Sequence, residues 1–284
     1  AEMRQKRQIL ALLFISSLLL QTHIHAAIEL KKGPPNPSDI QVVPMERTPE
    51  PGQVSLRLEY PKNGTVETKQ PVDMQMRLDW FPLGVESGNF PRRHQIADSN
   101  RGQTLHVFID NFEYFTVNEA LFDALDDHDQ FYDQTTEFSL PFKLSPGMHV
   151  VRAFPCRSFA ESLKENNTSI ASIFYIDQKT PKLDVNLSDP YLTYNQPQGS
   201  FPDPKQPILL DFYINNCTLS KDGFKVRMTI DGGNKRFLND WVPYYIYGLA
   251  PGRHTIKLEL INPQNEVCPG LFNSVSRTFT IESD

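Results

Sequence analysis

The feature that most constrains this chain is a pattern of segments that occurs twice. Each copy contains the turn motif Leu-x-Pro-Gly-x-His, in which proline fixes φ and glycine tolerates a positive φ. A run of alternating apolar and polar residues follows each motif. Three pairs of segments correspond in the same order along the chain: 71–80 with 207–216, 105–111 with 226–232, and 144–149 with 249–254. Internal similarity of this kind indicates a duplicated domain, with a boundary near residues 180–181.

Apolar and polar residues alternate through most of the chain beyond residue 53, for example over 54–60 and 138–144. Strict alternation predicts antiparallel strands that bury one face each, and several such strands separated by turn residues predict a sandwich of two sheets. The chain also holds 23 prolines against 14 glycines, which favours short strands and firm turns over helices. We therefore expect an all-β protein with one sandwich over 53–178 and a second over 181–284.

The first residues have the order of a secretory signal peptide. Arg4, Lys6 and Arg7 precede an apolar run of 12 residues at 9–20, and the segment then turns polar and ends in small residues. As a helix this run spans about 18 Å, short of the roughly 30 Å hydrocarbon core of a bilayer. We expect residues 1–27 to be a cleaved signal peptide and the protein to be exported to the periplasm or the cell surface. An uncleaved leader is the alternative, and it is the only contact with a membrane that we expect.

Residues 28–52 contain six prolines and no periodic apolar face. Such a stretch prefers extended, polyproline-like conformations, so we expect a Pro-rich linker between the leader and the first sandwich. The whole chain carries a formal net charge of -6. An acidic chain lacks the basic footprint of a general nucleic-acid binder, and a single long apolar run excludes a polytopic membrane protein.

Several longer stretches carry a resemblance to known proteins. The strand end Ile-Asp-Asn or Ile-Asp-Gly, followed further along by the Pro-Gly-x-His turn, resembles bacterial immunoglobulin-like and fibronectin III-like modules. The chain also resembles an uncharacterised family of exported, mainly cyanobacterial proteins. The stretches that carry this second resemblance are LHVFIDN at 105–111, RAFPCRSFAESLK at 152–164, LLDFY at 209–213 and FLNDWVPYYIYGLAPGRHTIKLEL at 237–260. The resemblance implies two tandem immunoglobulin-like β-sandwich domains in an exported protein, and it implies no activity.

The first copy carries an insertion that the second copy lacks. The two Ile-Asp strand ends are 121 positions apart and the two Pro-Gly turns only 105, so the first copy has 16 extra residues, which coincide with 118–134. The candidate binding residues there are Asp123, Asp126, Asp127, Asp129 and Asp133. Their carboxylates suit calcium or a basic partner surface, although no Asp-x-Asp-x-Asp-Gly loop is present. A solvated acidic loop is the plainer interpretation.

Aromatic residues gather in the second copy, where strand alternation places some of them on an outer face. Exposed rings of Trp241 and Tyr245 would stack on sugar rings or contact a protein partner. Ordinary packing, or contact between the two domains, is the alternative.

The histidines give little support for a metal site. His149 and His254 occupy the same turn in both copies, which favours a structural role in hydrogen bonding to backbone. His106 faces outward from its strand, and His128 lies in the insertion. With nearby carboxylates these two are weak candidates for a transition metal, but no His-x-His or His-Glu-x-x-His spacing supports them. We predict no bound cofactor, with calcium as the alternative.

Three cysteines are present in the chain. Cys217 and Cys268 lie in the same copy, near the ends of strands that we expect to be neighbours, so an exported chain favours a disulfide between them. Closing their 51-residue separation would stabilise the fold by about 4 kcal/mol through the loss of loop entropy in the unfolded chain. Cys156 would remain a spare thiol with no named base beside it.

Taken as a whole, the sequence favours a non-catalytic protein. We expect an exported envelope or cell-surface module with an interaction or structural role, whose partner is an envelope protein or a glycan. Two alternatives remain open: a metal- or carboxylate-dependent glycan hydrolase, and a periplasmic module that binds calcium or a transition metal. No nucleotide-binding glycine loop, Gly-x-Ser-x-Gly elbow or serine-protease-like arrangement occurs in the sequence.

Overall fold

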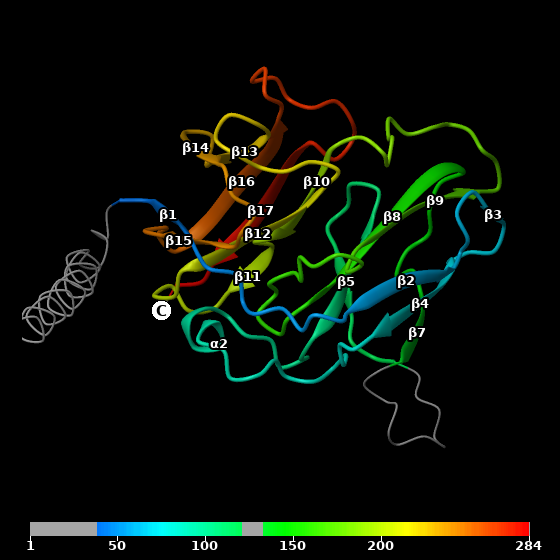
Figure 1. The fold of residues 1–284 in the computed structure, drawn as a ribbon, viewed down its shortest axis with the longest axis horizontal. Coiled ribbons are helices and arrows are strands. Elements are labelled where there is room, and N and C mark those ends of the chain that lie inside the picture. Colours follow the sequence, from blue (N-terminus) through cyan, green and yellow to red (C-terminus); the bar gives the residue numbers. More distant parts are fainter. Residues whose placement is uncertain (1–38, 121–132, 284) are drawn as a thin grey trace, which may run out of the picture.

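The computed structural model describes residues 39–120 and 133–283, which form two β-sandwiches side by side (Figure 1). The helix found among these residues is the short α2 (Arg92–Gln95). Within the described ranges, no helix is long and apolar enough to cross a membrane. The predicted signal peptide at 1–27 lies outside the described residues. The expected all-β fold class with two sandwiches is confirmed.

Sandwich 1 consists of a three-stranded sheet in the order β2-β4-β7 and a five-stranded sheet in the order β3-β9-β8-β5-β6. The strands are β2 (Ser55–Tyr60), β3 (Val66–Glu67), β4 (Asp73–Asp79), β5 (Thr104–Ile109), β6 (Phe115–Val117), β7 (Gln134–Ser139), β8 (Gly147–Cys156) and β9 (Ile170–Ile176). The parallel pair is β3 with β9, and the other neighbours are antiparallel.

Sandwich 2 repeats this topology with one added strand: its sheets have the orders β10-β12-β15-β1 and β11-β17-β16-β13-β14, and β1 (Gln41–Pro44) is the addition. Its strands are β10 (Tyr191–Gln196), β11 (Gly199–Phe201), β12 (Ile208–Asn215), β13 (Lys225–Ile230), β14 (Asn234–Leu238), β15 (Tyr244–Tyr247), β16 (Gly252–Ile261) and β17 (Ser274–Ile281). The parallel pair is again the equivalent one, β11 with β17. Two halves with one strand order agree with the duplicated sequence pattern.

Each sandwich encloses its own apolar core, built from the inward-facing residue of each alternating pair. Met76 of β4 and its counterpart Phe212 of β12 are both 0% exposed. The same holds for Leu105 of β5 and its counterpart Val226 of β13. The period of two in the sequence therefore locates both cores.

The prediction that residues 28–52 form a linker is wrong for their described part. β1 (Gln41–Pro44) lies antiparallel to β15 as an edge strand of sandwich 2, with Val43 opposite Tyr245. Val42 packs on the core of that sandwich. Proline lacks a donor N–H, which an edge strand tolerates. A four-residue strand is too short for its alternation to stand out among the prolines.

The residues that follow, 45–52, form a strap that contacts both sandwiches. On sandwich 2, the Arg47 guanidinium donates to the carbonyl of Trp241 from Nε at 2.9 Å and from Nη2 at 2.6 Å. On sandwich 1, Thr48 donates to the Glu161 carboxylate from its N–H at 2.9 Å and from its hydroxyl at 2.6 Å. The strap therefore ties the two sandwiches together before the chain enters β2.

A histidine–aspartate clasp holds the same turn in each sandwich. In sandwich 1, Nδ1 of His149 lies 2.7 Å from Oδ2 of Asp110, and its Nε2 lies 2.7 Å from the carbonyl oxygen of Ser145. In sandwich 2, His254 makes the equivalent contacts, each at 2.7 Å, with Asp231 and a turn carbonyl. Both histidines thus hold backbone turns, as their place in the repeat predicts.

Both ring nitrogens of each clasp histidine face an acceptor oxygen, so the ring satisfies both contacts only as an imidazolium. Burial by itself lowers the pKa of His149, but the hydrogen bonds to Asp110 and to the Ser145 carbonyl outweigh it and raise the pKa above the ordinary value of 6.5. The pKa of His254 is raised in the same way. A histidine pKa that is higher in the folded state stabilises the fold below the unfolded pKa, and this stabilisation is lost as pH rises through the folded pKa.

Replacing His149 by glutamine should therefore cost most in acid. We expect the variant to lose about 1.5–3 kcal/mol of unfolding free energy near pH 5.5, the range for hydrogen bonds to charged groups, and less near pH 9. Urea unfolding at a series of pH values measures the difference. His94→Gln is the matched control, because His94 is exposed and contacts Asn89 within its own loop. A His149→Gln penalty that stays constant with pH would contradict the imidazolium assignment.

Candidate functional site

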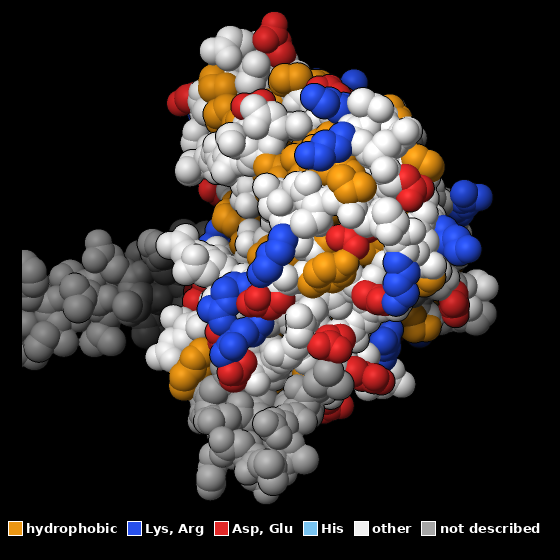
Figure 2. Space-filling view, turned by 90° about the vertical axis from the view of Figure 1, so that its right-hand side faces the viewer, with side chains coloured by type: hydrophobic (Ala, Val, Ile, Leu, Met, Phe, Trp, Pro, Cys, Tyr) orange, Lys and Arg blue, Asp and Glu red, His pale blue; other side chains and the backbone are white. Residues whose placement is uncertain are grey.

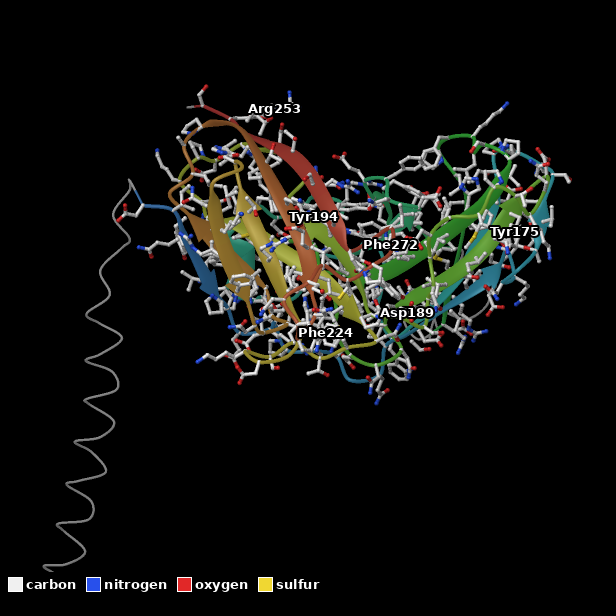
Figure 3. All side chains as sticks on the ribbon, turned by 90° about the horizontal axis from the view of Figure 1, so that it is seen from above. Tyr175, Asp189, Tyr194, Phe224, Arg253 and Phe272 are labelled. Carbon is white, nitrogen blue, oxygen red and sulfur yellow. The ribbon has the colours of Figure 1, made fainter. Side chains whose placement is uncertain are left out.

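The two sandwiches pack through different faces. The outward face of β5 and β8 in sandwich 1 covers the outward face of β10 and β12 in sandwich 2. Phe154 of β8 stacks on Tyr213 of β12, with ring centroids 4.8 Å apart, and both residues are buried. Figure 3 shows Phe272 of sandwich 2 at this junction, whereas Tyr175 lies at the far end of sandwich 1. The junction is thus an aromatic and polar interface outside both cores.

The two copies differ in sequence at the positions that one sandwich buries against the other. Where β5 and β12 are covered, their outward residues are His106, Phe108, Leu209, Asp211 and Tyr213, all buried. The counterparts on the uncovered strands β13 and β4 are Arg227, Thr229, Asp73, Gln75 and Arg77. Uncovered charges pair locally, as Arg227 does with Glu259 at 2.8 Å. On the sandwich 1 end of the molecule, Figure 2 shows Lys and Arg interspersed with Asp and Glu.

A buried polar network crosses the middle of this junction. Nζ of Lys164 in sandwich 1 lies 2.6 Å from Oδ1 of Asp211 in sandwich 2, and both side chains are 0% exposed. Oδ2 of Asp211 accepts a hydrogen bond from Nδ2 of Asn195 at 2.8 Å. Oδ1 of Asn195 lies 2.7 Å from Nδ1 of His106. The network therefore links Lys164 and His106 of sandwich 1 through Asp211 and Asn195 of sandwich 2.

The partners of Asn195 fix the protonation of His106. The Asn195 amide group donates to Asp211 and, at 2.9 Å, to the carbonyl of Ala160, so Oδ1 of Asn195 is the acceptor that faces His106. Nδ1 of His106 must then carry the hydrogen. Burial lowers the pKa of His106 to about 4, against the opposing effects of Asn195 and Asp211. At neutral pH the ring is uncharged, and its Nε2 is a bare acceptor.

A second buried ion pair lies under the strap. Nε of Arg92, the first residue of α2, is 2.6 Å from Oε2 of Glu161, and the two side chains are 8% and 3% exposed. The Arg92 guanidinium also donates to the Tyr245 hydroxyl at 3.3 Å. That hydroxyl in turn donates to Oε1 of Gln95 at 2.9 Å. Residues from α2, the strap and β15 therefore meet in one cluster.

A cleft of about 220 Å³ opens between the sandwiches beside the buried network. Sandwich 1 contributes Thr104, His106 and Tyr114 to its wall, and sandwich 2 contributes Gln198, Phe201 and Leu209. The loop between β4 and β5 forms the rim with Asp98, Ser99 and Arg101. The wall of this cleft requires both sandwiches.

The aromatic binding platform predicted at Trp241 and Tyr245 is absent. Tyr245 is 1% exposed, because sandwich 1 covers it with Ile96 and Phe159. Trp241 is partly buried, donates from Nε1 to the carbonyl of Phe212 at 2.9 Å and packs edge-on against Tyr213. Strand alternation placed Tyr245 outward correctly, but that outward face is the junction, so the alternative of contact between the two domains describes it. Trp241 precedes β15, and ordinary packing within sandwich 2 describes it.

The acidic insertion is largely beyond the described residues. Asp123, Asp126, Asp127, Asp129 and His128 all lie in the undescribed range 121–132. Asp133 is described, and its carboxylate forms an ion pair with Arg77 of β4. Asp133 therefore has a basic partner within sandwich 1.

The weak metal candidate His106 has Asn195 and Tyr114 as neighbours instead of metal-type ligands. Across residues 39–120 and 133–283, no cluster of three or more His, Cys, Asp or Glu side chains is placed to hold a metal ion. His106 is not placed to bind a metal through Nδ1, because that nitrogen is hydrogen-bonded to Asn195 in the junction network.

The three cysteines are free thiols in the structure, so the predicted disulfide between Cys217 and Cys268 is not formed there. Both nevertheless contact the core of sandwich 2. Burial, with a smaller contribution from Cys268, raises the pKa of Cys217 to about 12. Cys156 is 0% exposed, and burial raises the pKa of its thiol far above the ordinary value. A protonated, buried thiol is a poor nucleophile.

Pattern analysis missed Asp211, Lys164 and Asn195. A signal was present, because Asp211 interrupts the apolar run LLDFY on a strand that is otherwise hydrophobic on both faces. A strand that is apolar on both faces is covered on both faces. A lone carboxylate within such a strand indicates a buried partner, which Lys164 supplies.

Comparison with known proteins gives no family assignment. No family model matches the chain, and no curated protein matches it significantly. The fibronectin(III)-like modules of Clostridium thermocellum CbhA share 9% identity, with a TM-score of 0.26 over 80% of this chain and 94% of that one. Dimeric latent PorU from Porphyromonas gingivalis shares 13% identity, with a TM-score of 0.25 over 89% of this chain and 21% of that one. These scores carry no argument about function, and the resemblance to a cyanobacterial family finds no support here.

Removing one charge of the central pair should destabilise the protein strongly. Asp211→Asn leaves the Lys164 ammonium buried without a counter-charge, and we expect a loss of about 3–5 kcal/mol in unfolding free energy. Adding Lys164→Met to that variant removes the stranded charge and should restore part of the loss. Asp73→Asn, in an exposed pair with Lys69, is the control and should leave the urea midpoint nearly unchanged. A double variant no more stable than Asp211→Asn alone would show that the pair is not the cause.

Proposed function

We propose that this chain is an exported, non-catalytic interaction or structural module of the periplasm or cell surface, in which the two sandwiches act as one body. The observation that carries this proposal is the Lys164–Asp211 pair, which joins the sandwiches with both side chains 0% exposed. Separating the sandwiches would bring each charge into water and break the network around it. A body of fixed shape is suited to presenting a surface or holding a spacing.

The state of the buried titratable groups supports a non-catalytic role. Both clasp histidines have each ring nitrogen bound to a structural acceptor. The Cys156 thiol is held protonated by burial. These groups stabilise turns or fill the interface.

Glycan hydrolysis, the leading alternative from the sequence, gains no support from the cleft. Among the described residues that line the cleft, Asp98 is the single carboxylate, and it accepts a hydrogen bond from Arg93 at 3.0 Å. Most glycoside hydrolases use a pair of carboxylates on either side of the scissile bond. For a calcium or transition-metal module, no observation on the described residues adds support, and we propose none.

Export motivates a proposal for the cysteines as well. Cys217 and Cys268 contact one core cluster, and in an oxidising compartment a disulfide-exchange catalyst would accept two electrons while the two thiols lose two protons and form the S–S bond. The proposed disulfide rests on two points: both cysteines contact the same core cluster, and the proposed export brings the chain into an oxidising compartment.

The one-body proposal predicts a single unfolding transition seen from both halves. Trp80 reports on sandwich 1 and Trp241 on sandwich 2, and the chain has no other tryptophan. In Trp241→Phe, the urea midpoint from Trp80 fluorescence should coincide with that from far-ultraviolet circular dichroism. The same should hold for Trp241 fluorescence in Trp80→Phe. Separate midpoints within either variant would count against a single body, whereas a uniform shift in both probes would not.

Export with disulfide formation predicts a difference in thiol labelling. After denaturation and treatment with a polyethylene-glycol maleimide, the full chain from an osmotic-shock fraction should take one label, on Cys156. The chain lacking 1–27, made in the cytoplasm, should take three. Cys156→Ser is the control. It should take no label in the osmotic-shock fraction and two labels when made in the cytoplasm. Retention of the full chain in the cytoplasm would contradict export, and three labels on shock-released protein would contradict the disulfide.

A further inference from the structure

Polar groups with open hydrogen-bonding capacity meet at the wall of the cleft. Thr104 is 5% exposed and His106 is 2% exposed. Neither the Thr104 hydroxyl nor Nε2 of His106 has a hydrogen-bond partner among the described residues. The Tyr114 ring stacks on His106, with centroids 3.9 Å apart and planes 17° apart. All three residues line the same cleft.

The open nitrogen of His106 faces the cleft. In the described part of the chain, the side-chain polar atoms that are both fully buried and without a partner are Oε2 of Glu50 and Nε of Arg152. Nε2 of His106 also lacks a partner but is not fully buried, so it remains accessible through the cleft. Because Nδ1–H is bound to Asn195, Nε2 offers only a lone pair. A ligand must therefore donate to it, which carboxylates, phosphate and sulfate do poorly.

Tyr114 supplies the complementary donor. Its hydroxyl accepts a hydrogen bond from Nε2 of Gln196 and keeps its own hydrogen available. Burial raises the pKa of Tyr114, so the phenol stays protonated at neutral pH. Gln198 donates to the Tyr114 carbonyl at 3.1 Å, which leaves Oε1 of Gln198 open. An acceptor and a donor close together match an alcohol, which both donates and accepts.

The guanidinium groups at the rim are hydrogen-bonded to neutral oxygen atoms of the protein. The Arg101 guanidinium donates to Thr116 at 2.5 Å and to Asn118 at 2.9 Å. Arg157 donates to the carbonyl of Pro49 in the strap. These bonds use only some of the N–H donors of each guanidinium, so the feature that favours an uncharged ligand is the neutral His106 with its lone pair.

Apolar side chains also line the cleft, and its volume is small. They include Phe159, Phe201 and Leu209. Hydrocarbon and aromatic surface suits the C–H face of a sugar ring. A volume of about 220 Å³ lies below the roughly 300–1,000 Å³ of sites for drug-sized ligands, which points to a ligand of one ring.

We propose that this cleft binds one neutral sugar unit, with a sugar hydroxyl donating to Nε2 of His106 and a second oxygen accepting from Tyr114. The inference goes beyond the proposed function, because a structural module needs no ligand in the cleft. Since both sandwiches form the wall, the site exists only when they are docked.

Saturation-transfer NMR on the full chain tests the proposal with the methyl glycosides of glucose, galactose, mannose and N-acetylglucosamine as probes. We expect at least one to bind with a Kd near the millimolar range, and Ser99→Trp at the exposed rim to weaken it by at least about tenfold. Ser276→Trp is the matched control, because Ser276 is exposed on β17 and does not line the cleft. Thr104→Val is a second variant, which removes one open hydroxyl without adding bulk.

Circular dichroism and the urea midpoint should show that each variant folds. Saturable binding by the wild type and by Ser276→Trp, with loss in Ser99→Trp, supports the proposal. The absence of binding for all four glycosides would overturn it, as would equal binding by Ser99→Trp. Sulfate binding that Ser99→Trp abolishes, with no glycoside bound, would identify an anion site and overturn the neutral-sugar assignment. None of these failures would alter the coincident unfolding expected of a single body.

Discussion

The arrangement of the whole molecule depends on burying one positive and one negative charge, from different sandwiches, at the same point. The side chains of Lys164 and Asp211 are each 0% exposed, and a buried charge without its partner is far more costly than the pair. The two sandwiches must therefore meet in one register. Asn195 and Ser162, which also bond to Asp211, extend that requirement to β10 and to the chain after β8. The pair selects one docking geometry more than it adds net stability.

The other features of the junction follow from that docking. The strap reaches Glu161 only because the segment after β8 is held against sandwich 2, and β1 can then pair with β15. The cleft lies beside the network at the junction, so its wall mixes residues from both halves. Interfaces between domains of one chain are often mobile, but buried ionic pairs and aromatic stacking oppose such motion here.

The folds of the two halves could be predicted from the sequence, because alternation and the repeated turn are local signals of strands and their ends. The docking could not. Whether an outward-facing Tyr245 meets water or another domain depends on long-range packing, which a period of two does not encode. The histidine clasps were accessible because duplication marked them as structural. The role of Nε2 of His106 as an acceptor could not be predicted, because it depends on the hydrogen bond between Nδ1 and Asn195, which is 89 residues away in the chain.

The unequal faces of the junction also determine which surfaces the two sandwiches leave uncovered. Sandwich 1 uses its β5–β8 face and sandwich 2 its β10–β12 face, so the contact is heterologous and could in principle stack further copies into an open filament. The faces that would extend such a stack are the β2–β4–β7 sheet and the β13–β16 face. Arg57 with Asp79, and Arg227 with Glu259, occupy them instead of aromatic rings. Charged pairs on these two faces disfavour a further contact of the same kind, which would bury aromatic rings.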